Sequence, residues 1–304
     1  MDSAAFLGLG VMGSGMASRL IDAGWSISLW NRRRERASAL VAKGARLATS
    51  PQDAAASAAV VISMVADDEA SRAIWLGDEG ALAGAKPGTI LIESSTLSPR
   101  WIEELAAAAA KGGCDLLDAP VTGSKTQAAS GQLLFLVGGD ARAFDRARKA
   151  FDAMGRDALH LGPTGSGATL KLINNFMCAV QSVALAEAIA MIELSGLDVA
   201  RALAMLMDGA PGSPLCKAVA PRMNGRDYSV NFALALMRKD VAYAMAEADR
   251  AGVSLRTAAA ARERFDAAIA EGWGDKDFAA VVEPLRKASR PRARTGPGRG
   301  ERKE

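Results

Sequence analysis

The sequence predicts an α/β fold: a doubly wound parallel sheet followed by an all-α C-terminal domain. Three observations support this. Short apolar runs alternate with helical patterns in the first half, a glycine-rich turn follows the first run, and only helical patterns remain after about residue 165. Strands that are apolar on both faces and separated by helices are typical of a parallel sheet covered on both sides. We therefore expect domains at 1–163 and 164–285, and a tail at 286–304.

Six runs are expected as strands because each is short, apolar and bounded by turn residues. They are AAFLGLG (4–10), SISLW (26–30), AVVISMV (59–65), TILIESS (89–95), DLLDAPV (115–121) and LLFLVGG (133–139). Helical periodicity marks 16–24 and 32–44 between them, and 184–194, 199–207, 241–252 and 257–272 in the second half.

The basic charge of the chain is concentrated in its tail. Residues 286–304 hold eight Lys or Arg and two Glu, which gives this segment a net charge of +6. The net charge of the whole chain is +3, so the other residues together carry about −3. The tail has no apolar periodicity and is rich in proline, glycine and charge, which predicts disorder. A solvated end is favoured over a segment that binds nucleic acid or an acidic partner.

Cysteine and histidine usage narrows the chemistry. Cys114, Cys178 and Cys216 lie far apart without CxxC spacing, so we expect neither a disulfide framework nor a metal site. His160 is the one histidine, and a Ser-His-Asp triad or a His-based dehydrogenase would depend on it alone. It is interpreted as a structural residue, which leaves lysine, carboxylates, serine, threonine and cysteine as catalytic candidates.

No membrane span or secretory signal is evident in the sequence. The most apolar stretch, 176–192, is interrupted by Gln181 and Glu187, and the N-terminus has no basic region followed by an apolar one. A cytoplasmic protein is therefore expected.

The segment FLGLGVMGSGMA has GxGxxG spacing between an expected strand and an expected helix. Gly8 would allow a tight turn, Gly10 a close approach of the backbone to a pyrophosphate, and Gly13 close packing of helix on strand. Phosphates would face the N-terminus of that helix. Residues Gly8, Leu9, Gly10, Val11, Met12 and Gly13 are thus predicted to bind a dinucleotide, the alternative being a purely structural glycine turn.

The end of the second expected strand favours NADP(H). Sites that prefer NAD place Asp or Glu about 20 residues after the glycines, where it binds the ribose 2′-hydroxyl. This chain has LWNRRRERA there, so Asn31 brings no carboxylate to repel a 2′-phosphate, while Arg32, Arg33 and Arg34 offer guanidinium groups to hold one. Arg32 is the expected contact. A solvated helix start is the alternative for part of this arginine run, and NAD(H) stays open as cofactor.

The segment TGSGATLKLINN (164–175) places Lys171 and Asn175 on one face of an expected helix. The helix continues almost entirely apolar, and buried lysines are rare unless they are paired or used. Two interpretations of Lys171 are therefore open. It has a function in a binding or catalytic site, or its side chain extends from a core helix to solvent.

Four stretches together resemble the β-hydroxyacid dehydrogenase family. They are GLGVMG (8–13), DAPVTGS (118–124), GSGATLKLINN (165–175) and FALALMRKD (232–240). Their order and spacing suit the family over nearly the whole chain except the tail. The resemblance implies a Rossmann-type domain, an all-helical domain, and an active site in the cleft between them. It implies that small hydroxy acids are interconverted with oxo acids or semialdehydes by hydride transfer with a nicotinamide.

The resemblance also implies roles for the polar residues of these stretches. Lys171 would be the catalytic acid/base and Asn175 would form hydrogen bonds in the active site. This agrees with the chemistry, since an ammonium can stabilise and protonate the oxygen of a carbonyl that accepts hydride. Partial burial would lower the pKa of that lysine toward neutral.

Substrate and cofactor contacts are implied in the same way. Thr122, Gly123 and Ser124 would hold the substrate carboxylate, with threonine where the family commonly has serine. Lys125 resembles the glyoxylate and succinic semialdehyde reductase branch. The remaining implied contacts are with the cofactor, at Met64, Val65 and Ala66 on the adenosine side, Thr96 beside the nicotinamide, and Lys239. Each has an alternative as a turn residue or surface charge, and Arg222 and Asp240 receive no role.

We therefore expect an NADPH-dependent reductase of small aldehyde acids or 2-oxo acids, of the glyoxylate/succinic semialdehyde type. The alternative is an NAD(P)-dependent 3-hydroxy acid dehydrogenase of the 3-hydroxyisobutyrate or serine type. An imine reductase is disfavoured because related imine reductases usually lack the lysine. A non-catalytic dinucleotide-binding protein that uses its tail on nucleic acid is disfavoured by the intact Lys171 and Asn175. The excess apolar surface of the helix after Lys171 predicts a homodimer or homotetramer.

Overall fold

The computed structural model describes residues 2–288. The chain divides into two compact units. Among the described residues, the sheet unit comprises 2–179 and 236–262, and the helical unit comprises 180–235 and 263–288.

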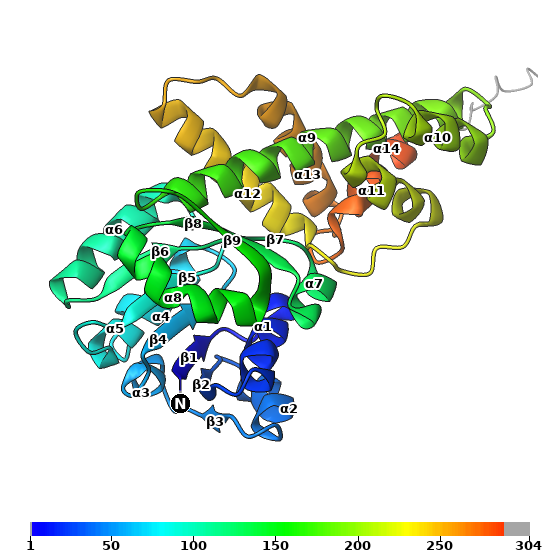
Figure 1. Ribbon diagram of the computed structural model, residues 1–304. Helices are drawn as coiled ribbons and strands as arrows, with labels where there is room; N and C mark the ends of the chain where they lie inside the picture. The colour runs from blue at the N-terminus through cyan, green and yellow to red at the C-terminus, as the bar shows by residue number, and fades with distance from the viewer. Residues whose placement is uncertain (1, 289–304) are drawn as a thin grey trace, which may run out of the picture. The chain divides into compact units, whose positions relative to one another are not determined.

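The strands of the described residues form one sheet within the sheet unit (Figure 1). They are β1 (Ser3–Leu7), β2 (Ser26–Trp30), β3 (Arg46–Leu47), β4 (Val60–Ser63), β5 (Ile90–Glu93), β6 (Asp115–Asp118), β7 (Val121–Thr122), β8 (Leu133–Gly138) and β9 (Gly155–Gly162). The order is β3-β2-β1-β4-β5-β6-β8-β7, with β9 also paired to β8. Neighbours from β3 to β6 are parallel, β8 runs antiparallel to β6 and β7, and β9 is parallel to β8. The predicted doubly wound α/β fold is confirmed.

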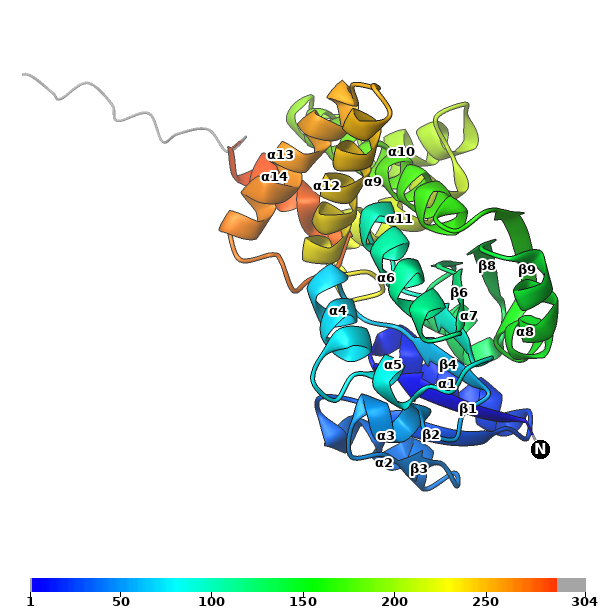
Figure 2. The same ribbon diagram turned by 90° about the vertical axis from the view of Figure 1, so that its left-hand side faces the viewer.

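Helices cover both faces of this sheet. Those of the first 160 residues are α1 (Val11–Asp22), η1 (Arg34–Ala37), α2 (Ser38–Val41), α3 (Pro51–Ala55), α4 (Asp68–Leu76), α5 (Ala81–Gly84), α6 (Pro99–Lys111), α7 (Lys125–Ser130) and α8 (Ala141–Met154). Ala4 and Phe6 of β1 pack in a buried cluster with α1 and α8, while Ala5 and Leu7 pack in a second cluster with α3, α4 and α6. Figure 2 shows the second group of helices together on one side of the sheet. Successive side chains point to opposite faces, which explains why the strand runs are apolar throughout.

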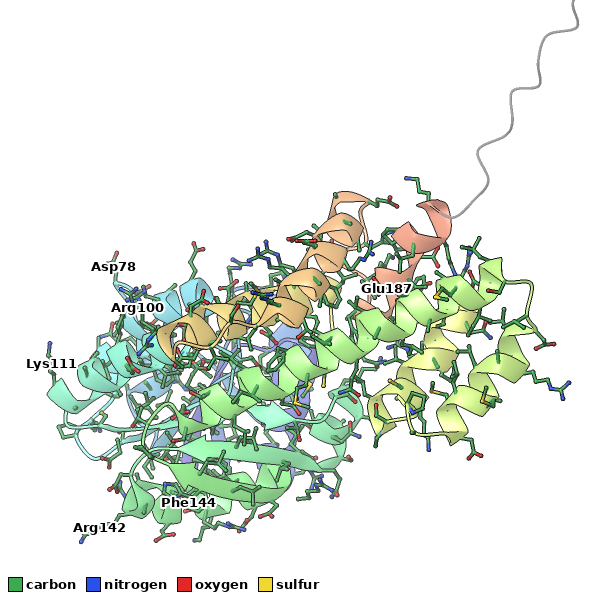
Figure 3. The ribbon with its side chains drawn as sticks, turned by 90° about the horizontal axis from the view of Figure 1, so that it is seen from above. Asp78, Arg100, Lys111, Arg142, Phe144 and Glu187 are labelled. Carbon is green, nitrogen blue, oxygen red and sulfur yellow. The ribbon has the colours of Figure 1, made fainter. Side chains whose placement is uncertain are left out.

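The rest of the described chain is helical. The elements are α9 (Ser166–Leu194), α10 (Val199–Asp208), α11 (Pro214–Gly225), α12 (Leu234–Arg250), α13 (Arg256–Ala270), η2 (Phe278–Val282) and α14 (Glu283–Ala288). In the helical unit, Arg264 of α13 pairs with Glu187 of α9 at 2.9 Å. Figure 3 labels Glu187 on α9. Buried Asp277 accepts the backbone N–H groups of Asn231 and Phe232 and so fixes the segment that leads into α12.

Three sequence expectations need correction. The segment 32–44 forms a 3-10 turn and one short helical turn instead of a full helix. The sheet also contains β9, which the sequence patterns missed because its exposed, polar-rich run lies at an edge and pairs only with β8. The sheet is parallel only as far as β6, since the strand that follows α7 turns back antiparallel.

The tail was expected to begin at Arg286. Arg286–Ala288 instead end helix α14, and the Arg286 side chain is buried, with ion pairs of 2.6 Å to Glu193 and 2.8 Å to Glu283. The predicted disorder of the remaining tail falls on residues outside the described range.

Helix α9 is long and apolar enough to cross a membrane by length and composition. Core helices of soluble proteins pass the same test, so this is weak evidence for a span. Leu170, Ile173 and Met177 on α9 are between 38% and 51% exposed. The homo-oligomer that was expected to cover such residues stays a prediction.

Candidate active site

The glycine turn after β1 has the strain and close contacts that a dinucleotide loop requires. Gly8 has a φ of 97°, which favours glycine, and its N–H donates to the carbonyl of Trp30 at 2.9 Å. A Cβ atom on Gly8 would lie 2.3 Å from the carbonyl oxygen of Met64, and one on Gly13 would lie 2.0 Å from that of Gly8. At Gly10, no atom of the described residues lies within 4 Å of the position of a Cβ.

The N-terminus of α1 faces this open space. Gly10 is the N-cap and has no side chain to accept the first N–H groups of the helix, which lack partners within it. These N–H groups and the helix dipole together suit an anion such as a pyrophosphate. Leu9 is buried while Val11 is 57% exposed at the first helical position. The loop therefore fits the phosphates of a dinucleotide, and a side chain at Gly10 would take up their space.

Asn31, at the end of β2, fixes the loop beside it. Its Oδ1 accepts the N–H of Leu9 at 2.8 Å, and its Nδ2 donates to the carbonyl of Arg33 at 2.7 Å. In the arginine run, Nη1 of Arg34 donates a hydrogen bond to the carbonyl of Ala48 at 3.3 Å. Arg32 and Arg33 are exposed. The side chain of Asn31 thus orders the turn that carries these two guanidinium groups.

The loops after β4 and β5 are tied to each other by side chains. The N–H of Val65 donates to Oγ of Ser95 at 2.7 Å. Glu93, fully buried, accepts from the hydroxyls of Ser63 and Ser71, from Nε1 of Trp75 and from the N–H of Ser95, all between 2.6 and 2.9 Å. Parallel strands end at one edge of the sheet, and these contacts hold the loop of Met64–Ala66 beside Ser95, while Met64 and Val65 also lie against Gly8.

Asn175, one helical turn after Lys171 on α9, contacts a buried carboxylate from α12. Nδ2 of Asn175 donates to Oδ2 of Asp240 at 2.6 Å, and both residues are buried. Lys239, the next residue on α12, forms an ion pair with Oδ1 of Asp240 at 2.9 Å. The Nζ atom of Lys239 also donates to the carbonyl of Thr96 at 2.5 Å. Two lysines, an asparagine and one carboxylate therefore gather near the end of β5.

The pKa of Lys171 is lowered, and its main cause is burial, which disfavours the ammonium. The carboxylate of Asp240 and the thiol of Cys178 oppose this by favouring the charged form, while the ammonium of Lys239 adds to the lowering. A lysine with a lowered pKa can exchange a proton near neutral pH, which an exposed lysine does poorly.

Asp118, at the end of β6, holds the start of the helix that carries Lys171. Its fully buried carboxylate accepts the N–H of Gly165 and that of Ala168, both at 2.8 Å. Burial raises the pKa of Asp118 to about 6, although these backbone N–H groups act in the opposite direction. Gly167 is required here, since a Cβ atom would lie 2.2 Å from the carbonyl oxygen of Leu136.

The loop after Asp118 begins with β7 and ends in α7. Thr122 is half-buried and Gly123 has a φ of 120°. Ser124 donates both its N–H, at 2.9 Å, and its hydroxyl, at 2.6 Å, to Oε1 of Gln127. Lys125 is exposed at the first position of α7. The donors of Ser124 that were expected to bind a carboxylate are therefore held by Gln127 in this structure.

Comparison with known proteins agrees with these features. Residues 3–162 match the NAD binding domain of 6-phosphogluconate dehydrogenase, and residues 165–285 match the domain described as NAD-binding of NADP-dependent 3-hydroxyisobutyrate dehydrogenase. The chain is 37% identical to an NAD-dependent L-serine dehydrogenase of Pseudomonas aeruginosa over 92% of this chain and 97% of that protein. This chain belongs to the β-hydroxyacid dehydrogenase family.

Two further relatives of this β-hydroxyacid dehydrogenase are informative. The chloroplastic glyoxylate/succinic semialdehyde reductase 2 of Arabidopsis thaliana is 34% identical over 94% of this chain and 80% of that protein. The structure of Mycobacterium tuberculosis 3-hydroxyisobutyrate dehydrogenase with L-serine superimposes with a TM-score of 0.85 at 33% identity, covering 94% of this chain and 99% of that one. The protein is thus an NAD(P)-dependent oxidoreductase that acts on CH–OH groups, and it binds NAD(P)(H).

The sequence missed some residues that shape the site of this dehydrogenase. Asp240 received no role although it bonds Asn175 and Lys239, and Asp118 and Glu93 were not singled out at all. A weak signal existed for the last two, since each is a carboxylate at the end of an apolar strand. For Asp240 the signal was its position beside Lys239. Across the described residues, no group of His, Cys, Asp and Glu is suited to hold a metal ion.

Proposed function

We propose that this enzyme uses NADPH to reduce small aldehyde acids or 2-oxo acids of the glyoxylate or succinic semialdehyde type, with Lys171 as general acid. The observation that carries the proposal is the lowered pKa of Lys171 on the helix face that also presents Asn175 to Asp240. A half-buried amine in this setting suits proton transfer to a carbonyl oxygen.

Each residue of the site would have a separate role in the reduction of the carbonyl. When bound, the reduced nicotinamide supplies hydride to the carbonyl carbon. Lys171 donates its proton to the oxygen as negative charge develops there, and the neutral amine regains a proton from solvent. Asp240 keeps the amide of Asn175 oriented through their 2.6 Å hydrogen bond. Thr122, Gly123 and Lys125 would bind the substrate carboxylate, while Ser124 would join them only if Gln127 releases its donors.

The start of α1 would hold the pyrophosphate, and Thr96 and Lys239 would lie by the nicotinamide. Met64, Val65 and Ala66 would line the adenosine side. These assignments are supported by two hydrogen bonds that join loops at one sheet edge, those of Asn31 with Leu9 and of Ser95 with Val65. The hydrogen bond from Lys239 to the carbonyl of Thr96 supports the placement of these two residues together.

The preference for NADPH rests on Asn31 and the exposed guanidinium groups of Arg32 and Arg33. We expect that replacing both arginines by Gln weakens NADPH binding by about tenfold or more while NADH binding changes little, because a 2′-phosphate gains charge-assisted hydrogen bonds that a hydroxyl does not. Dissociation constants from fluorescence titration measure this. Arg36→Gln, on the same exposed turn, is the matched control. An equal loss for both cofactors would remove the 2′-phosphate argument.

A second candidate is the oxidation of a 3-hydroxy acid such as 3-hydroxyisobutyrate or L-serine. It is favoured by two relatives, one named for L-serine and NAD and the other solved with L-serine. In this direction neutral Lys171 would accept the hydroxyl proton.

Initial rates decide between the two candidates. We expect NADPH with glyoxylate or succinic semialdehyde to give the highest kcat/KM in a panel that also holds tartronate and methylmalonate semialdehydes. The same panel includes NAD⁺ and NADP⁺ with L-serine and 3-hydroxyisobutyrate. A higher kcat/KM for either hydroxy acid with NAD⁺ would favour the second candidate and contradict the first.

A further inference from the structure

Tyr243 lies one helical turn after Lys239 on α12, and it contacts both Lys239 and the start of α4, which follows the Met64–Ala66 segment. The Nζ atom of Lys239 lies 4.7 Å from the centroid of its ring. Its hydroxyl accepts the N–H of Asp68 at 3.3 Å, at the first position of α4. No role in the proposed function has been given to this residue.

We propose that Tyr243 is a positioning residue that holds the Lys239 ammonium in the cofactor site and links it to the loop after β4. The inference rests on the proposed function, because it takes Lys239 to be a cofactor contact. It goes beyond that function because it identifies Tyr243 as the aromatic residue that holds the Lys239 side chain in place.

The contacts of Lys239 explain why a ring is needed. An ammonium has three N–H donors and sits on a flexible four-carbon chain that loses much entropy when it is fixed. The carbonyl of Thr96 and the carboxylate of Asp240 hold two sides of this ammonium, at 2.5 and 2.9 Å. The face of the Tyr243 ring attracts the charge from a third direction. An aliphatic side chain at position 243 would leave that side open to motion.

The hydroxyl of Tyr243 makes the second connection. Asp68, whose N–H it accepts, also receives the N–H and hydroxyl of Ser98 through its carboxylate, at 3.0 and 2.5 Å. Asp67 caps α4 directly before it. Tyr243 therefore touches the turn that follows Met64–Ala66 as well as Lys239. Burial raises the pKa of Tyr243 to about 12, so the hydroxyl stays neutral over the working pH range.

A double-mutant cycle tests this proposal in the full-length protein. The variants are Tyr243→Leu, Tyr243→Phe, Lys239→Met and the double variant Lys239→Met/Tyr243→Leu. The measurements are the dissociation constant of NADPH by fluorescence titration and the thermal midpoint of the apo protein. We expect Tyr243→Leu to raise the dissociation constant roughly three- to thirtyfold, and Tyr243→Phe to raise it less, because the ring remains. In the Lys239→Met background, Tyr243→Leu should have little further effect.

Three results would overturn the proposal. One is an unchanged dissociation constant in Tyr243→Leu, and another is an equal increase in the presence and absence of Lys239, which would indicate packing alone. The third is an unchanged constant in Lys239→Met, since Tyr243 could not then act through this lysine. If Tyr243→Leu lowers the midpoint of the apo protein, Tyr243→Met replaces it in the cycle. The role of Lys171 is measured separately by turnover, so its failure and the failure of this inference are distinguishable.

Discussion

Lys171→Ala should lower the rate of carbonyl reduction by roughly two to four orders of magnitude, while NADPH binding stays within a few fold of that of the unaltered enzyme. The reason is that the substituted enzyme can still present the cofactor but no longer has a proton donor for the developing alkoxide. Burial lowers the pKa of Lys171, which makes its ammonium a stronger proton donor than that of an exposed lysine.

Single-turnover rates under saturating NADPH measure this loss without a contribution from product release. Lys217→Ala is the matched control, because Lys217 is an exposed lysine in the middle of α11. Turnover close to that of the unaltered enzyme would contradict the assignment of Lys171 as general acid. A similar loss in NADPH affinity would instead indicate damage to the cofactor site.

Asp240→Asn is expected to move the high-pH limb of the reduction rate to lower pH. The carboxylate of Asp240 favours the charged form of Lys171, so its removal lowers the pKa of that lysine further. Less of Lys171 is then protonated at neutral pH, and reduction, which needs the protonated form, slows. In the oxidative direction the neutral amine is the active form, so the low-pH limb should move to lower pH as well.

The same substitution should destabilise the fold by about 3–5 kcal/mol, because it leaves the Lys239 ammonium, which is held beside buried Asn175, without its carboxylate partner. The pKa of Lys171 in the folded state lies below its unfolded value, so the unfolded chain binds more protons between the two values and stability rises with pH there. Asp240→Asn lowers the folded-state pKa of Lys171 further, so its deficit should shrink as pH rises from the folded-state pKa of the variant to that of the unaltered enzyme, and stay constant above it.

The shift of the high-pH limb is measured from the reduction rate as a function of pH. The stability deficit is measured by thermal unfolding at pH 6, 8 and 10. Asp249→Asn, an exposed aspartate on the same helix, is the matched control. A high-pH limb that stays in place, or moves upward, would mean that Asp240 does not set the proton affinity of Lys171. A stability deficit that grows with pH would contradict the linkage.

Local pattern was sufficient for the fold class. The strands β1, β2, β4, β5, β6 and β8 all overlap the expected apolar runs, because burial on both faces makes each strand apolar along its own length. The turn at Gly8, Gly10 and Gly13 was predictable from its spacing between a strand and a helix, although the close approach of Gly8 to Met64, which follows β4, depends on the tertiary structure. The roles given to Thr122–Lys125 remain predictions.

The sequence by itself determined the parts of this protein that depend on near neighbours: the strand faces, the glycine turn, and the shared helix face of Lys171 and Asn175. Only the tertiary structure decided which distant groups meet them. Asp240 bonds Asn175 across 65 positions and Asp118 holds Gly165 across 47. Arg286 lies buried beside Glu193, although its own segment reads as a solvated tail. Such pairings depend on strand order and helix packing, and the periodicity of one segment carries no information about the segment that will lie against it.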